Sequence, residues 1–379
     1  TFAGNVFFYS GLINMVDSLD ELSAVMCHEI GHVSARHISK GMQRQNKIMI
    51  AQLVGLLAGA LIGGEAAAPL ILGSQAVGQQ AIINFTRDNE READQLGFKY
   101  MTAAGFDPRE MITLFKQFNQ MKRMSPYVDK IPTYLQTHPM DSERMSNADS
   151  MMKDYTPEEP GEEAIRLRKL FPFFQAIIRA KTLEPHDAEK LFLRELGKIP
   201  NSISSHYGLG VVYTKDQNDN KAILHLKKAL KAKPYFYPIL TSLGKAYQGK
   251  GEDEKAISFF TKAMALNEED NSIPFHIGIS YQNMGKHDEA IRYFKKLTYY
   301  KPVESGVYYH LGLSYGRQNK LVLAHYNFGI YYKRWRSIEK ATFHFQKAFE
   351  LAKEYSEMRE KIKKEQEELR KFPIQRNRG

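Results

Sequence analysis

The chain has 379 residues, of which 43% are hydrophobic and 25% charged, so it is long enough for two or three domains and too apolar to be mainly disordered. Its single cysteine excludes an intramolecular disulfide framework. The net charge of +10 is unevenly divided: residues 1–160 hold 14 Lys and Arg against 18 Asp and Glu, which leaves 39 against 25 for the remainder. Because those basic residues are spread over predicted helical faces without a nucleic-acid motif, we expect no nucleic-acid partner.

The chain opens with a predicted strand and a predicted helix. Residues 4–9, GNVFFY, are aromatic and β-branched and predict a strand of a small edge sheet. Such a strand either pairs with an extended substrate peptide or is an ordinary buried strand. A helix is predicted after the polar residues 17–21, because apolar residues then recur at three-to-four spacing, at Leu22, Val25, Met26 and Ile30.

An uncharged region follows. No charged residue lies between Lys47 and Glu65, and this apolar stretch is just short of the ~20 residues that a membrane span needs. Residues 66–86 are also uncharged but contain Pro69, Gly73 and several glutamines, which favours a helical hairpin over a bilayer span. We interpret residues 47–86 as a hairpin that either forms a lid over a site or contacts a membrane surface.

Two further helices are predicted over residues 87–104 and 108–124. Residues 125–162 are rich in proline, serine and acidic residues, which is typical of a boundary between domains. We therefore predict a first domain over residues 1–160.

The second half repeats with a period of 34 residues. The repeated positions are Gly210, Gly244, Gly278 and Gly312, with Ala222, Ala256, Ala290 and Ala324, and the large residues Leu226, Phe260, Phe294 and Phe328. The pattern resembles the tetratricopeptide repeat, in which small residues let two antiparallel helices approach and large residues fill the gap between successive units. It predicts an all-α solenoid over residues 201–353.

The ends of the solenoid depart from this pattern. Residues 161–200 are predicted as a linker and an incomplete capping repeat, since Ala188 and Phe192 keep the register of the second helix but the first-helix pattern is missing. Phe328 and Gly329 restart the motif only 17 residues after Leu311, so the helix over 321–333 is expected to close one unit and open the next. Residues 354–379 predict a charged helical tail.

The chemistry of the first domain is indicated by residues 28–32, His-Glu-Ile-Gly-His, which form the H-E-x-x-H pattern on a predicted helix. Side chains four residues apart lie one above the other on a helix, so His28 and His32 can bind one metal ion, with Glu29 beside them. His37, nine residues after His28, is expected about 180° around the helix and is therefore not expected to be a ligand.

A second helix supplies the candidate third ligand. Catalytic zinc takes three protein ligands and keeps one position for water, and two histidines with a glutamate form one established set. Glu90 and Asp94 share one face of the helix over residues 87–104, whereas Glu92 points away and is expected to be solvated. We choose Glu90 as the ligand and Asp94 as acceptor of the free ring N–H of a ligand histidine. The alternative is two ordinary helix histidines.

At this point the chain resembles a known family. The HEIGH helix, the helix with Glu90-x-x-Ala93-Asp94, and Thr137-His138-Pro139 followed by Arg144 are similar to the HtpX and CaaX-prenyl-protease family of zinc metallopeptidases. With a repeat array behind this domain, the chain is most similar to the periplasmic BepA-type branch of that family. The resemblance implies a zincin-like α+β metallopeptidase domain followed by the all-α solenoid.

The resemblance also implies roles for individual residues. His28, His32 and Glu90 would bind one catalytic zinc ion, Glu29 would be the general base, and His138 would approach the metal. Two roles for His138 stay open: it stabilises the oxyanion of the reaction, or it is a fourth zinc ligand that silences the resting enzyme. The first of these roles is expected of Arg144 too.

The function implied is that of a zinc-dependent endopeptidase of the bacterial cell envelope, in quality control or assembly of outer-membrane proteins. The repeat array would bind clients or an assembly partner. The resemblance places the protein in the periplasm, and any export signal is expected before Thr1. Membrane association through residues 47–86 stays open beside the lid. The alternative is a chaperone or scaffold whose array is the active part and whose zinc site is silenced or vestigial.

Overall fold

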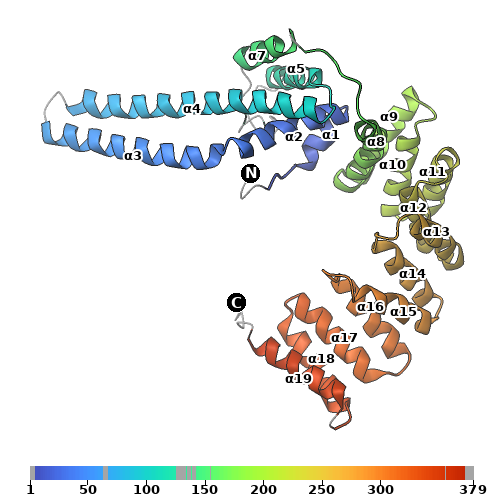
Figure 1. Cartoon of the computed structure of the whole chain (residues 1–379). Helices are drawn as coiled ribbons and strands as arrows, with labels where there is room; N and C mark the ends of the chain where they lie inside the picture. The colour runs from blue at the N-terminus through green and yellow to red at the C-terminus, as the bar shows by residue number, and fades with distance from the viewer. Residues whose placement is uncertain are drawn as a thin grey trace. The chain divides into compact units, whose positions relative to one another are not determined.

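The computed structural model describes residues 5–62, 67–124, 134, 138, 142–153, 155–354 and 356–371 (Figure 1). The chain divides into two compact units, Thr1–Thr182 and Leu183–Gly379. The first contains α1 (Ser10–Met15), α2 (Leu19–Ser34), α3 (His37–Ile62), α4 (Ala67–Ala103), α5 (Arg109–Met124), α7 (Ser142–Lys153) and α8 (Glu162–Thr182). The predicted mainly helical fold is confirmed.

The second unit is entirely helical over its described residues. Its helices are α9 (Pro185–Lys198), α10 (Ile203–Lys215), α11 (Asp219–Ala232), α12 (Tyr237–Gly249), α13 (Asp253–Leu266), α14 (Ser272–Asn283), α15 (His287–Leu297), α16 (Ser305–Arg317), α17 (Leu321–Arg334), α18 (Ile338–Leu351) and α19 (Glu357–Arg370).

Helix α2 carries the H-E-x-x-H pattern and anchors it in the core of the first unit. Its N-terminus is capped by Ser18, whose Oγ accepts a hydrogen bond from the amide of Glu21 at 3.0 Å. Leu22 and Val25 are buried in the core cluster that α5 also lines. The pattern therefore sits on a helix whose position is fixed by apolar packing.

The predicted edge sheet is wrong for the part of the chain that the structure describes, where no residue lies in a strand. Residues 6–9 are irregular: Phe8 packs against the core of the first unit, but Phe7 is 80% and Tyr9 71% exposed. An extended segment needs a neighbouring strand for its backbone hydrogen bonds. Among the described residues only Asn5 forms a single β-bridge, and residues 6–9 are held by the packing of Phe8 instead of by a sheet.

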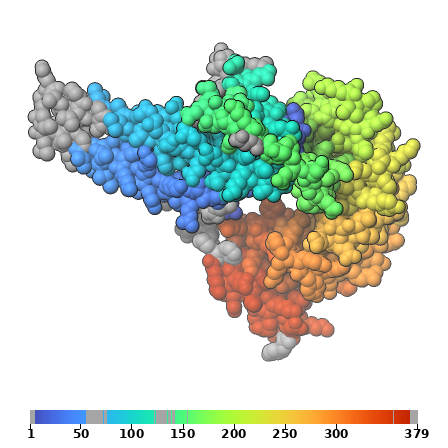
Figure 2. Space-filling view, turned by 45° about the horizontal axis from the view of Figure 1, so that its top comes forward, coloured from blue at the N-terminus to red at the C-terminus, as the bar shows by residue number. Residues whose placement is uncertain are grey.

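Helices α3 and α4 pair as a long hairpin that extends away from the other helices of the first unit (Figures 1 and 2). The hairpin carries apolar side chains that are at least 55% exposed, namely Met49, Ile50, Leu53 and Val54 on α3 and Leu72 and Val77 on α4. Among the helices in the described residues, none is both long enough and apolar enough to cross a bilayer.

Helix α8, which lies in the predicted linker, is grouped with the first unit. Gln175 donates from Nε2 to the carbonyl oxygens of Ile13, at 2.9 Å, and Val16, at 2.6 Å. Arg168 donates to both carboxylate oxygens of Asp20, at 2.6 and 2.7 Å. These bonds join α8 to α1 and to the first turn of α2.

In the second unit, α10 to α17 form successive helix pairs at the predicted positions, with the repeat glycines against the large residues. A Cβ added at Gly244 would lie 2.4 Å from Cε1 of Phe260, and one at Gly278 would lie 2.7 Å from Cε1 of Phe294. Two helices can approach this closely only where one of them has no side chain.

Helix α17 is shared between two units of the array, as the 17-residue step predicts. A Cβ at Gly312 of α16 would lie 2.8 Å from the ring of Phe328 on α17. A Cβ at Gly329, also on α17, would lie 2.5 Å from the ring of Phe345 on α18. The same helix therefore supplies the large residue for one contact and the small residue for the next.

Hydrogen bonds also join neighbouring repeats. Gln248 of α12 donates from Nε2 to the backbone oxygen of His276, at 2.9 Å, and to Oγ of Ser280, at 2.7 Å. Gln282, 34 residues later, makes the equivalent two bonds to α16. The repeats are thus tied by polar bonds as well as by packing.

We expect Gly244→Ala to lower the free energy of unfolding by about 1–3 kcal/mol, because the fully buried Phe260 would have to move out of a well-packed interior. Urea unfolding followed by far-UV circular dichroism measures the change. Gly197→Ala in α9 is the matched control, since its new Cβ would meet no atom within 4 Å, and it should stabilise by about 0.5–1 kcal/mol. Equal effects of the two substitutions would contradict the packing described here.

Candidate metal centre

Small residues bring α2 and α4 into close contact beside the H-E-x-x-H pattern. A Cβ added at Gly31 would lie 2.8 Å from the carbonyl oxygen of Ala93, which is itself fully buried. A Cβ added at Gly97 would lie 3.1 Å from the backbone nitrogen of His28. This approach places the acidic side chains of α4 against the histidines of α2.

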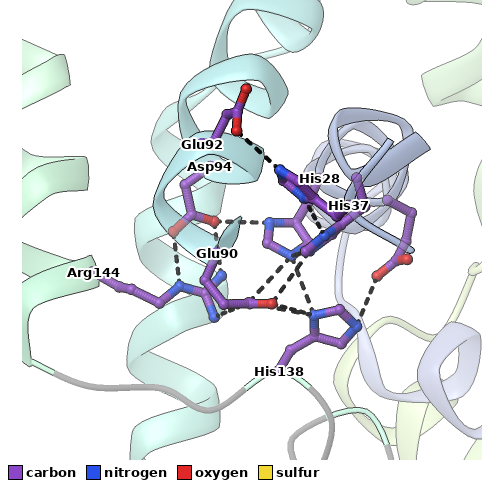
Figure 3. A network of polar contacts seen from close by, with 9 residues as sticks. His28, His37, Glu90, Glu92, Asp94, His138 and Arg144 are labelled. Atoms are coloured by element: carbon purple, nitrogen blue, oxygen red, sulfur yellow. Dashed lines mark hydrogen bonds and ion pairs between the residues drawn. The ribbon is translucent and has the colours of Figure 1, made fainter. Parts of the chain in front are cut away.

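Four of the predicted site residues converge on one point (Figure 3). Nε2 of His28 lies 3.0 Å from Nε2 of His32 and 3.5 Å from Oε2 of Glu90. Nε2 of His32 lies 3.3 Å from Oε1 of Glu90. Nδ1 of His138 lies 3.1 Å from Oε1 of Glu90 and 3.4 Å from Nε2 of His28.

These spacings fit a tetrahedral metal ion. Ligand atoms about 2.1 Å from a tetrahedral ion are separated from each other by about 3.4 Å. Five of the six separations among the four side chains, counting either Glu90 oxygen, run from 3.0 to 3.5 Å, and ligand atoms from all four lie within 4.8 Å of one another. Three imidazole nitrogens and one carboxylate oxygen are donors that divalent transition metals prefer. The arrangement is therefore suited to one divalent ion.

Asp94 and Arg144 hold the ligands from behind. Nδ1 of His28 donates to Oδ1 of Asp94 at 2.8 Å, so Nε2 is the nitrogen that faces the centre and would bind a metal ion once it has lost its proton. Arg144 donates from Nε and Nη2 to the two oxygens of Asp94, each at 2.7 Å, and from Nη1 to Oε2 of Glu90 at 2.8 Å. Its guanidinium is buried against the carboxylates; the oxyanion role expected of it stays a prediction.

The charges at the centre depend on one another. Burial acts to raise the pKa of Glu90, but contacts with His138, His28 and His32 outweigh it and hold the pKa well below its usual value. Burial acts to lower the pKa of His28, but Asp94 and Glu90 raise it to about 9. In the metal-free protein a proton on His28 therefore faces an ionised Glu90. A divalent ion would replace that proton, so its binding would release it.

Glu29 lies at the edge of this group. Its side chain is 14% exposed, and its Oε1 lies 3.3 Å from Nε2 of His138. That oxygen is buried, and its described polar neighbour is Nε2 of His138. A carboxylate at the edge of the ligand group is placed where a general base is needed.

Two residues set aside in the sequence also contact the site. His37 is not among the converging ligands, but its Nδ1 lies 2.8 Å from Nδ1 of His32. Its Nε2 lies 3.1 Å from Oε2 of Glu92, whose side chain is 49% exposed, so Glu92 faces solvent as expected and also contacts His37.

The reason is a break between α2 and α3. Along one continuous helix the side chains of His32 and His37 would point about 140° apart. Instead α2 ends at Ser34, Arg36 adopts a φ of 55°, and α3 begins at His37, which turns this imidazole back towards His32. No glycine, proline or asparagine marks the break, so the sequence carries no signal for it.

We expect Arg144→Met to destabilise the metal-free protein by about 3–5 kcal/mol, because Asp94 and Glu90 would remain buried without their cation. Urea unfolding in the presence of a chelator measures the loss. Arg91→Met is the control: Arg91 is 40% exposed and pairs with the exposed carboxylates of Asp88 and Glu143, so its loss should cost less than about 1 kcal/mol. A small effect of both substitutions would show that the buried pairs contribute little.

Comparisons with known proteins agree with both units. Residues 1–152 match the model of peptidase family M48. Models of the tetratricopeptide repeat match residues 203–236, 239–273 and 275–304.

Several curated relatives are similar to the chain. The β-barrel assembly-enhancing protease of Yersinia pestis is 29% identical over 251 residues, which cover 64% of this chain and 50% of the relative. The putative β-barrel assembly-enhancing protease of Vibrio cholerae is 32% identical over 247 residues, covering 62% and 49%. The mitochondrial metalloendopeptidase OMA1 of Arabidopsis thaliana is 31% identical over 144 residues, covering 38% and 26%. The chain thus spans about half the length of the first two relatives. The resemblance predicted from the sequence is confirmed, and the chain carries a domain of peptidase family M48 followed by tetratricopeptide repeats.

Proposed function

We propose that the chain is a zinc-dependent endopeptidase whose zinc ligands are His28, His32 and Glu90. The observation that carries this proposal is the convergence of these side chains, with neighbouring ligand atoms 3.0–3.5 Å apart. The match to peptidase family M48 supports a hydrolytic role for the site. Two histidines and one glutamate are a known ligand set of catalytic zinc.

The residues around the ion would divide the work of peptide hydrolysis. Zinc would act as a Lewis acid that lowers the pKa of a water molecule to about 7. Glu29, whose carboxylate lies at the edge of the ligand group, would take the proton of the attacking water and deliver it to the leaving amine. Asp94 would keep Nε2 of His28 free for the metal by accepting its Nδ1–H.

We assign His138 as the fourth ligand of a resting state. Its Nδ1 lies 3.1 Å from Oε1 of Glu90, at the same spacing as the other ligand atoms. Because a catalytic zinc site needs one position for water, this imidazole would have to withdraw before hydrolysis begins. In the withdrawn position it can take the other predicted role and donate a hydrogen bond to the oxyanion.

We further propose that the enzyme acts in the bacterial periplasm on outer-membrane proteins during quality control or assembly. The names of the β-barrel assembly-enhancing relatives support this assignment. The repeat array would bind clients or an assembly partner, the usual task of such solenoids. The contact of His138 with the metal ligands favours one feature of the chaperone or scaffold alternative, a metal site that is silent at rest.

For the α3–α4 hairpin we propose contact with a membrane surface. Its exposed apolar side chains support this role, because a patch of this kind is disfavoured in water. A lid over the metal centre is the alternative, and the two roles make different predictions below.

Glu29→Gln should reduce cleavage of an unfolded protein substrate by at least about 100-fold, since the general base would be lost. Its zinc content should stay at one ion per chain, because the ligands are unchanged. Glu90→Ala should lose both zinc and proteolysis. Metal analysis and a casein-cleavage assay on the three purified proteins provide the measurements.

Two outcomes would contradict the proposal. Unchanged cleavage by Glu29→Gln would remove Glu29 from the mechanism, and full zinc occupancy in Glu90→Ala would remove Glu90 from the ligand set. If Glu29→Gln still supports outer-membrane protein assembly in cells, the chaperone function of the array is separable from proteolysis.

Replacing Leu53 and Val54 together by aspartate should weaken binding to anionic phospholipid vesicles by about tenfold or more, because each substitution removes apolar area from the contact. Co-sedimentation measures the binding. Leu193→Asp on α9, where the leucine is 47% exposed, is the control and should bind as the wild type does. If vesicle binding is unchanged but deletion of the hairpin tip speeds hydrolysis of a small peptide, the hairpin is a lid instead.

A further inference from the structure

The metal ligand His32 has a polar partner on the side of its ring away from the centre. While Nε2 of His32 faces Glu90 at 3.3 Å, its Nδ1 lies 2.8 Å from Nδ1 of His37. Figure 3 shows His37 and Glu92 on the side of the metal centre opposite to His138. The His37 side chain is only 4% exposed, so water cannot readily replace it as the partner of His32.

The partners of His37 fix where its hydrogen lies. A carboxylate only accepts, so Nε2 of His37 must carry the hydrogen that bonds to Oε2 of Glu92, at 3.1 Å. The tautomer of His37 that has its ring hydrogen on Nε2 presents a lone pair on Nδ1. Nδ1 of His32 must therefore be the donor in the contact between the two rings, which leaves the lone pair of its Nε2 directed at the centre.

Nε2 of His28, the other histidine of the H-E-x-x-H pattern, is directed at the centre by a different partner. Nδ1 of His28 donates directly to Asp94, at 2.8 Å. His32 has no such carboxylate in direct contact with its Nδ1 among the described residues, and His37 stands between it and Glu92. Glu92 is half exposed, and its Oε2 also lies 3.7 Å from Nζ of Lys40. The series of hydrogen bonds from His32 through His37 to Glu92 therefore ends at the protein surface.

We propose that His37 is a positioning residue for the metal site: it selects the tautomer of His32 that binds metal, and Glu92 selects the tautomer of His37. The inference rests on the metal centre of the proposed function. A partner that orients a ligand histidine in this way is typically worth about 10–100-fold in metal affinity. The break at Arg36 contributes to the metal site in this way, because it turns the imidazole of His37 back towards His32.

The test uses zinc affinity of the full chain, measured by competition with a chromophoric chelator at fixed pH. His37→Phe keeps a ring in the buried site but removes the acceptor, and it should weaken zinc binding by about 10–100-fold. His37→Asn places Oδ1 near the position of Nδ1 and restores the acceptor, so its affinity should stay within about threefold of the wild type. Melting of each metal-free protein checks that the variants fold alike.

Glu92→Gln and Asp88→Asn form a matched pair, because each removes one charge from the exposed side of α4. Glu92→Gln should weaken zinc binding by about threefold to tenfold, since its amide can donate to His37 and favour the wrong tautomer. Asp88→Asn should have no effect. Equal losses of zinc affinity in this pair would mean that Glu92 acts only through its charge. That result would overturn its part of the proposal.

The outcomes separate this inference from the proposed function. If the wild-type chain binds no zinc, both fail. If the wild type binds zinc and His37→Phe binds it equally well, only the role of His37 is overturned. Equal weakening by His37→Phe and His37→Asn, with unchanged melting temperatures, would overturn the acceptor role in particular, because the asparagine retains the acceptor.

Discussion

The distance between the backbones of α2 and α4 is the constraint on which the metal centre depends. Glycines at positions 31 and 97 leave no side chain between the helices, and any Cβ there would meet backbone atoms of the neighbouring helix. A glutamate side chain has limited reach, so a separation larger by one methyl group would carry Glu90 away from the two imidazoles. The ligand set is thus determined as much by residues without side chains as by the ligands themselves.

Charge balance explains why the site needs more than its ligands. Glu90 and Asp94 are both buried, and an isolated buried carboxylate is strongly disfavoured. Arg144 offsets part of this cost from α7, and the proton on His28 offsets more in the metal-free state. A divalent ion brings two positive charges to the same point. Arg144 and a bound ion would therefore balance the two carboxylates together.

The sequence predicts those parts of the site that depend on one regular helix. The spacing of four residues identifies His28 with His32 and Glu90 with Asp94, because such pairs share a helix face. His138 is predicted as a site residue only through the resemblance of the chain to a family, since no periodicity relates this residue to α2. The contact of His37 was missed because it requires a non-glycine residue with positive φ at Arg36, and such a break follows from tertiary packing.

The same limit applies to the fold as a whole. The repeat array was predictable because the 34-residue period records the same helix–helix contact several times. The start of the chain shows the opposite case: the sequence predicts a strand over residues 4–9, but the described residues 6–9 are irregular, because a strand needs a second segment that pairs along its length.

The glutamine bonds between successive repeats have a consequence for local opening of the array. To separate α12 from α14, the protein must break two bonds of Gln248 in addition to exposing apolar surface, and Gln282 imposes the same requirement on α14 and α16. Fraying that starts at one end of the solenoid therefore slows at each of these junctions. Backbone amides of α14, which lies between the two, should exchange with solvent deuterium more slowly than those of the terminal helices.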